Sequence, residues 1–350
     1  HHRHSKAAKA HLAVQQDFFR LVSSHSRIGR VRSKVAALHG KYDGYPCFGA
    51  YCVNVWGRGP HFGVNGNFDD NSSWHIARDV FYPNGKNWSC FTHNCKEGPI
   101  GLASPNALGS LNIVPVEEEW GDYSLLAFFG YNKAEAAEND RILRRVKEGS
   151  TLLLTLAHLT CTTDRKAIQA YELSFEDHPI FTHMGFDGVP RFSQATYGGK
   201  EIPVGENLCV EESEILVKTD DGRPLIVEKQ CGKGKIVFFN TMYYPGNSVI
   251  HDAYQAEFQA RSAEVAANEN LFPVVGEDVQ AVVYDLPDAT QAVYMIAIDW
   301  WNMEKGDRTL QLRINGIHYP LSLPFGVMKK ALVKDGVAVV CQSETADILR

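Results

Sequence analysis

Residues 122–156 read DYSLLAFFGYNKAEAAENDRILRRVKEGSTLLLTL, and they give the clearest indication of the fold class. The apolar run Asp122–Gly130 and the later run Ser150–Leu156 both predict buried strands. Between them, Lys133–Glu148 has the spacing of a helix, which Gly149 ends. A strand, a helix of this length and a second strand together indicate a parallel sheet with helices on its faces.

The same pattern extends on both sides of this stretch. Ser33–Gly40 is a short apolar run that ends in glycine, and it predicts a further buried strand. Ile250–Asn268 predicts a long helix that closes the domain. Weak patterning over Thr160–Glu212 indicates loops and one helix around Phe181–Phe192. Other strands are expected at Leu111–Val116, Glu214–Thr219, Pro224–Gln230 and Lys235–Thr241.

The glycine pair in Cys231-Gly232-Lys233-Gly234 invites a comparison with phosphate-binding loops. Such a loop needs a helix directly after its glycines, whereas a strand is expected here. We therefore interpret this segment as a hairpin turn.

After Pro273 the pattern changes to short segments that alternate apolar and polar residues between turn residues. They predict a small antiparallel β-sandwich. The expected strands are Val279–Tyr284, Gln291–Ile298, Thr309–Ile314, Val327–Val333 and Val337–Cys341.

Two segments near the start stand apart from this plan. Residues 6–25 have an apolar helical stripe that includes Leu12, Phe18 and Phe19. We expect this helix to pack on a neighbour upstream of His1, and docking on the elements that follow it is the alternative. The region 41–110 is rich in Gly, Asn and aromatic residues, with one expected helix at Ser72–Tyr82. Long irregular segments of this kind are usually functional or insertions.

Composition excludes several classes of partner. The chain has 35 Lys and Arg against 41 Asp and Glu, so its net charge of −6 offers no basic field to nucleic acid or to an anionic membrane. Its apolar runs, such as Ile236–Phe239, are far shorter than the roughly 20 residues that cross a bilayer. We expect a protein that binds neither nucleic acid nor membrane.

Eight cysteines are too few for a disulfide scaffold in a chain of this length, which favours a reducing compartment and a cytoplasmic location. Cys90 and Cys95 flank His93, and with Cys47 and Cys52 they have the residue types of a zinc site. Four residues separate the members of each pair, however, whereas zinc ribbons separate them by two. We expect no metal and no cofactor.

Nucleophilic catalysis would need a Cys or Ser on a tight turn flanked by glycines. Cys161 follows a predicted strand, but no glycine adjoins it. We therefore do not expect glutaminase or triad-hydrolase chemistry.

Ligands of open parallel sheets collect beyond the carboxyl ends of the strands. Aromatic faces and carboxylates at these ends are the groups that stack on sugar rings and accept hydrogen bonds from hydroxyls. For Tyr42 and Asp43, a plain turn with Gly44 is the alternative, and a solvated helix start is the alternative for the run Glu117–Glu119. The candidate substrate-binding residues are His39, Tyr42, Asp43, Glu117, Tyr131, Asn132 and His158.

The order of these elements resembles the amidotransferase-like middle domain of β-galactosidase-type glycoside hydrolases. The residues that carry the resemblance are Val35–Gly40, Asp122–Gly130, Arg141–Leu154, Asp221–Val227 and Cys231–Asn240. In that family the domain follows a catalytic (β/α)8 barrel, often forms trimer contacts and precedes a small β domain. The family's catalytic glutamates lie on barrel strands, so no catalytic residue is carried over to this chain.

The resemblance implies a division into three parts. Residues 1–30 would hold a helix of the upstream barrel, 31–270 a three-layer α/β domain of the flavodoxin or amidotransferase-like type, and 271–350 a β-sandwich. The implied function is that of a non-catalytic C-terminal part of a glycoside hydrolase, which would form homo-oligomers such as trimers and shape the site of an oligosaccharide or glycoside. Two alternatives stay open: a complete glycosidase with carboxylates at Asp43 and Glu117 or Glu119, and a stand-alone module that binds sugar or protein.

Overall fold

The structure is a computed structural model. It describes residues 9, 12, 16, 29–40, 73, 76, 77, 80, 81, 111–116, 122–130, 135–160, 174–175, 178–268, 274–275, 279–297, 308–314, 317–323, 328–335 and 337–341.

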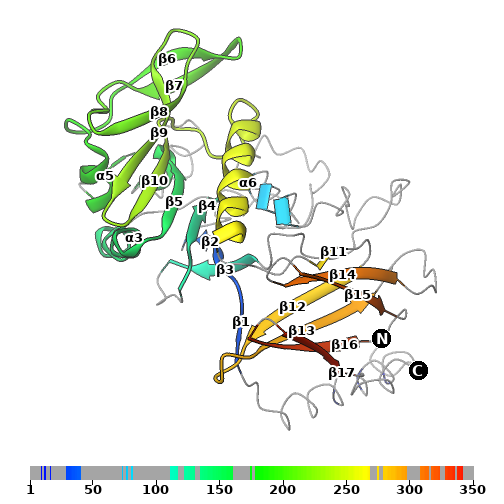
Figure 1. The fold of residues 1–350 in the computed structure, drawn as a ribbon. Coiled ribbons are helices and arrows are strands. Elements are labelled where there is room, and N and C mark those ends of the chain that lie inside the picture. Colours follow the sequence, from blue (N-terminus) through cyan, green and yellow to red (C-terminus); the bar gives the residue numbers. More distant parts are fainter. Residues whose placement is uncertain are drawn as a thin grey trace.

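A seven-stranded sheet forms the centre of the larger part of the molecule (Figure 1). The first five strands in the spatial order are parallel, and the last two are antiparallel to their neighbours. The prediction of an α/β fold with a mostly parallel sheet is therefore confirmed. The strands, in spatial order, are β3 (Leu111–Pro115), β2 (Val35–His39), β4 (Leu125–Phe128), β5 (Thr151–Thr155), β10 (Gly234–Phe239), β9 (Pro224–Cys231) and β8 (Ser213–Lys218).

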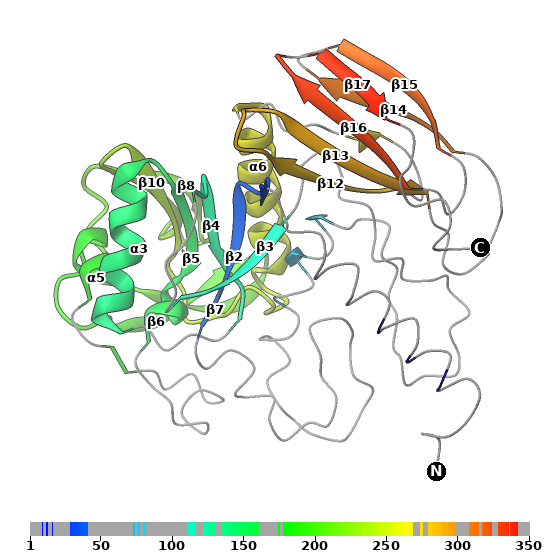
Figure 2. The same ribbon diagram turned by 90° about the horizontal axis from the view of Figure 1, so that it is seen from below.

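Helices cover both faces of this sheet, as Figure 2 shows. On one face lie α3 (Ala136–Glu148) and α5 (Pro179–Met184), and on the other lies α6 (His251–Asn268). Each face buries its own apolar cluster, which is why the central strands are almost continuously apolar. Described residues within the expected helix Ser72–Tyr82 are helical, and the apolar ones among them join the cluster beneath α6.

Local sequence explains where α3 begins and ends. At its start the side chains and backbones of Glu135 and Glu138 form a capping box, which satisfies N–H groups that have no partner inside the helix. At its end Gly149 has a φ of 138°, a conformation that glycine adopts at little cost. The helix then turns directly into β5.

The segment Cys231–Gly234 is the turn of the β9–β10 hairpin, as the sequence predicted. A Cβ atom on Gly234 would lie 2.0 Å from the carbonyl oxygen of Ser150 and 2.3 Å from that of Val146. Glycine is needed here because the hairpin packs directly against the backbone at the end of α3.

Two antiparallel sheets account for the C-terminal part. One has the order β1-β12-β13-β16-β17 and the other β11-β14-β15. The strands are β1 (Arg30–Val31), β11 (Val274–Val275), β12 (Val279–Asp285), β13 (Gln291–Ala297), β14 (Arg308–Ile314), β15 (Ile317–Leu323), β16 (Met328–Lys334) and β17 (Val337–Cys341).

The structure contains strands that the sequence pattern did not predict. The hairpin of β6 (Phe192–Tyr197) and β7 (Lys200–Gly205) replaces the loops expected after α5. Strand β15 was missed as well, and so was β1, which pairs with β12 far along the chain. Near the start, the described residues 9, 12 and 16 are helical, and Leu12 is 53% exposed.

Among the described residues, no helix has both the length and the apolar character needed to span a membrane.

Candidate functional site

The strand order places one pair of strand ends at the point where a parallel sheet usually binds its ligand. Along the chain β2 is followed by β3 on one side of it and then by β4 on the other side, so the direction of winding reverses at β2. The ends of β2 and β4 are in register, with Leu38 opposite Phe128. Crevices beyond the carboxyl ends of such strands are the common ligand sites of open α/β sheets.

The predicted site residues lie at or after the carboxyl ends of β2, β3, β4 and β5 in the sequence, and two of them are described. His39 is the last residue of β2, is half-buried, and accepts a hydrogen bond from the Val116 N–H at its backbone oxygen, 3.1 Å away. His158 follows β5 within η2 (Leu156–Leu159). The others, namely Tyr42, Asp43, Glu117, Tyr131 and Asn132, lie outside the described residues, as do Cys161, Glu119, His93 and the four cysteines weighed as zinc ligands.

His158 is completely enclosed at the carboxyl end of β5. Its ring stacks on Phe128 with centroids 5.2 Å apart, and its other neighbour is the ring of Tyr244, 5.3 Å away. Nδ1 accepts a hydrogen bond of 2.9 Å from the backbone N–H of Thr155, so the neutral ring has its proton on Nε2. The Tyr244 hydroxyl donates to the carbonyl of Ala157 at 3.2 Å and closes the same corner.

Burial determines the electrostatics of this histidine. Desolvation lowers the pKa of His158 to about 3, although hydrogen bonds with the backbones of Phe129 and Gly130 act in the opposite direction. The imidazole is therefore neutral near pH 7. With no exposed surface in this structure, its ring packs the end of β4 against that of β5.

The end of β10 is occupied by the β6–β7 hairpin. Asn240 Nδ2 donates to the carbonyl of Gly205 at 2.8 Å, and the Thr241 hydroxyl donates to the carbonyl of Pro203, also at 2.8 Å. These two polar side chains hold the hairpin over the strand end. The end of β10 is therefore covered, whereas Tyr42 and Asp43 follow the end of β2 in the sequence, and Tyr131 and Asn132 follow the end of β4.

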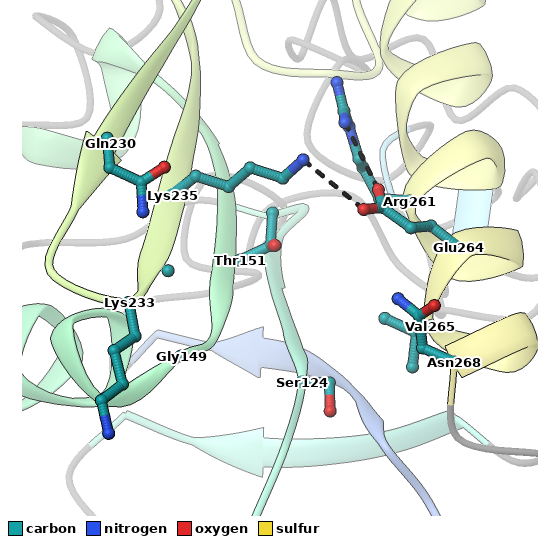
Figure 3. Close-up of a pocket in the computed structure, with 11 residues that line it drawn as sticks. Ser124, Gly149, Thr151, Gln230, Lys233, Lys235, Arg261, Glu264, Val265 and Asn268 are labelled. Carbon is teal, nitrogen blue, oxygen red and sulfur yellow. Dashed lines mark hydrogen bonds and ion pairs between the residues drawn. The ribbon is translucent and has the colours of Figure 1, made fainter.

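A separate pocket of about 400 Å³ lies at the opposite, amino edge of the sheet (Figure 3). It is bordered by the starts of β5 and β10 and by the last turns of α6. Thr151 and Lys235 point from the sheet toward Glu264 on α6, whereas Lys233 points away from that helix. The remaining lining residues are Ser124, Gly149, Gln230, Gly234, Arg261, Val265 and Asn268.

An ionic network forms the wall of this pocket. The Arg261 guanidinium lies 3.0 Å from Glu228 and 3.2 Å from Glu257, and both of these glutamates are about one-fifth exposed. Lys235 Nζ lies 3.4 Å from Glu228 and 3.6 Å from Glu264. Because the two cations already face three carboxylates, the network ties α6 to β9 and β10 and has no surplus positive charge for an anion.

Sequence reasoning missed this network, although part of its signal was present. Glu257, Arg261 and Glu264 have the four- and three-residue spacings that bring side chains together on a helix. Their contact with Glu228 and Lys235 depends on how α6 crosses the sheet, which no local pattern gives.

Comparisons with known proteins give structural matches only. No protein-family model matches the sequence, and no curated protein does either. Among solved structures, the chain is similar to Gan42B, a GH42 β-galactosidase from G. stearothermophilus, with a TM-score of 0.48 and 12% identity over 87% of this chain.

Two other solved structures give similar values. The β-galactosidase from Bacillus circulans sp. alkalophilus matches 87% of this chain at 12% identity and a TM-score of 0.48, and 42% of that enzyme is covered. The β-galactosidase from Rahnella sp. R3 matches 89% of this chain at 15% identity and a TM-score of 0.46, and 42% of it is covered. The chain thus spans about 40% of the length of these enzymes.

Proposed function

We propose that this chain is the C-terminal part of a carbohydrate-active glycoside hydrolase, with no catalytic residue of its own, and that it shapes a sugar-binding site and supports oligomerisation. The class of enzyme comes from the resemblance of the sequence to β-galactosidase-type hydrolases. On this proposal residues 31–270 form an amidotransferase-like domain, 271–350 a β domain, and 1–30 belong to an upstream barrel.

One observation carries the sugar-binding part of the proposal. The carboxyl ends of β2 and β4 are adjacent at the point where the winding of the sheet reverses. The sequence places Tyr42 and Asp43 shortly after the first of these ends, and Tyr131 and Asn132 shortly after the second. A phenol ring, a carboxylate and an amide provide stacking, acceptors and a donor for a pyranose.

Calorimetric titration of the chain with galactose- or glucose-containing oligosaccharides tests this part. We expect Asp43→Ala to weaken binding by about 1–3 kcal/mol, the cost of leaving polar partners without a hydrogen bond, and to leave the melting temperature nearly unchanged. The control is Asp187→Ala, which removes an exposed carboxylate in the turn after α5. No binding at millimolar sugar, or unfolding of the Asp43→Ala variant, would refute a sugar site at this edge.

Two further measurements test the rest of the proposal. The chain should not hydrolyse nitrophenyl glycosides, and turnover that disappears in Asp43→Asn or Glu117→Gln would favour a complete glycosidase instead. Sedimentation at tens of micromolar should show self-association. A single 39.0 kDa species would contradict the oligomerisation role of this chain.

A further inference from the structure

A groove of about 510 Å³ lies between α3 and α5. These two helices cover the face of the sheet opposite α6 (Figure 2). Its two ends differ in charge. Lys147, in the last turn of α3, and His183, in the last turn of α5, line one end, whereas Asp140 lines the groove nearer the start of α3. The other lining residues are Ala136, Leu143, His178, Pro179 and Thr182.

A third cationic side chain comes from β9. Lys229 alternates with Val227 and Cys231, which belong to the apolar cluster beneath α3 and α5, so its side chain lies on the same face of the sheet. Its Nζ lies 3.5 Å from the position that a Cβ atom on Gly185 would occupy, and Gly185 ends α5 two residues after His183. The ammonium group is thus held beside the cationic end of the groove.

In the part of the chain that the structure describes, these cations have no carboxylate partner. Among the described residues, none of Lys147, Lys229 and Lys233 has an Asp or Glu within ion-pair distance, and Lys229 is half-buried. Lys233 belongs to the adjoining hairpin turn, where its N–H donates to the Lys147 carbonyl at 3.0 Å. Partial burial of an ammonium group without a carboxylate is unfavourable, and a bound anion would remove that cost.

The charges of the neighbouring lysines affect the pKa of His183. Desolvation lowers its pKa, a hydrogen bond to the Gln230 carbonyl raises it, and the charges of Lys229 and Lys147 lower it further. Asp140 is seven positions before Lys147, about 10 Å along the helix at 1.5 Å per residue, so it compensates these charges only weakly.

We propose that Lys147, Lys229 and His183 form a binding site for a phosphate dianion, either free or carried as a phosphomonoester. Two ammonium groups and an imidazole that protonates when an anion arrives match a doubly charged oxyanion better than a single carboxylate. The site lies on α3, α5 and β9, away from the strand ends of the proposed sugar site. It therefore goes beyond the proposed function and does not depend on it.

Two measurements on the full chain test the proposal. Calorimetric titration with inorganic phosphate should show saturable binding that Lys147→Ala or Lys229→Ala weakens about tenfold or more, because each removes a charge-assisted contact. Lys200→Ala, which removes an exposed lysine at the start of β7, is the matched control and should bind like the wild type. Glycerol 2-phosphate serves as the second probe, and tighter binding than that of inorganic phosphate would identify a phosphomonoester as the ligand.

An NMR titration of the histidine side chains locates the anion. The signal of His183, assigned by its loss in His183→Gln, should titrate about half a pH unit higher in phosphate than in chloride of equal ionic strength. This difference should disappear in Lys147→Ala. Because the Lys147 side chain is exposed, this substitution should not unfold the chain. Equal titration in both salts, or phosphate binding unchanged in both lysine variants, would overturn the proposal.

Discussion

The buried imidazole of His158 makes the stability of the α/β part depend on pH, and the size of the effect follows from its pKa. The pKa of about 3 in the folded chain lies below the ordinary value of 6.5, so the folded state disfavours the protonated ring. The stability contribution is fully present above pH 6.5 and is lost as the pH falls toward 3, because the unfolded chain then binds a proton that the folded chain refuses.

Linkage gives the magnitude. Between about pH 7 and about pH 5 the unfolded histidine goes from mostly neutral to almost fully protonated while the folded one stays neutral, which removes about 2 kcal/mol from the free energy of unfolding. Other titrating groups add their own dependence, so the wild type must be compared with a variant. In His158→Asn the amide oxygen can still accept the N–H of Thr155, but the side chain does not titrate.

Urea unfolding followed by tryptophan fluorescence at the two pH values measures this quantity. From about pH 7 to about pH 5, the free energy of unfolding of the wild type should fall by about 2 kcal/mol more than that of His158→Asn. Phe128→Leu is the control, because it loosens the packing around the ring without removing the titrating group, and its pH dependence should follow that of the wild type. An identical pH dependence in wild type and His158→Asn would refute the reasoning.

Three further predictions concern contacts that hold the sheet and its helices together. Tyr254→Phe removes a buried hydroxyl that donates to carbonyls of β4 and β5, and should cost about 1–2 kcal/mol in urea unfolding, whereas Tyr197→Phe should cost little; equal effects would contradict the assigned hydrogen bonds. Gly234→Ala forces a Cβ atom into backbone oxygens and should lower the melting temperature more than Gly222→Ala, where only the positive φ opposes the substitution; the reverse order would be inconsistent with this packing. Arg261→Met leaves three glutamates close together and should destabilise the chain by about 1–2 kcal/mol at low salt and by less at high salt, and a salt-independent loss would indicate packing rather than charge.

The central sheet could be predicted because its strands leave a local signal. Segments such as Val35–His39 and Thr151–Thr155 are buried on both faces, so their sequences are continuously apolar and stand out from the helices between them. The β9–β10 turn was predicted for a similar reason, since the glycines are required by the hairpin itself.

The missed elements differ in what they offered. The β6–β7 hairpin has Gly198-Gly199 at its turn, a dipeptide that favours hairpin turns and is therefore a local sequence signal. Strand β15 contains Pro320, which argues against a central strand, and it lies at the edge of its sheet, where proline is tolerated. Strand β1 is only two residues long and exists through pairing with β12, so it has no local signal at all.

For the candidate sites, too, the sequence predicts local features but not the contacts between distant segments. The sequence placed His39 and His158 near the carboxyl ends of strands, but the enclosure of His158 depends on Phe128 and Tyr244, which come from distant segments. The residues of the proposed phosphate site, Lys147, His183 and Lys229, come from three separate elements, and no sequence spacing relates them. A sequence pattern can therefore indicate which residues stand at an edge of the sheet, whereas only the packing decides which of them are enclosed as structural groups and which surround a space that a ligand could occupy.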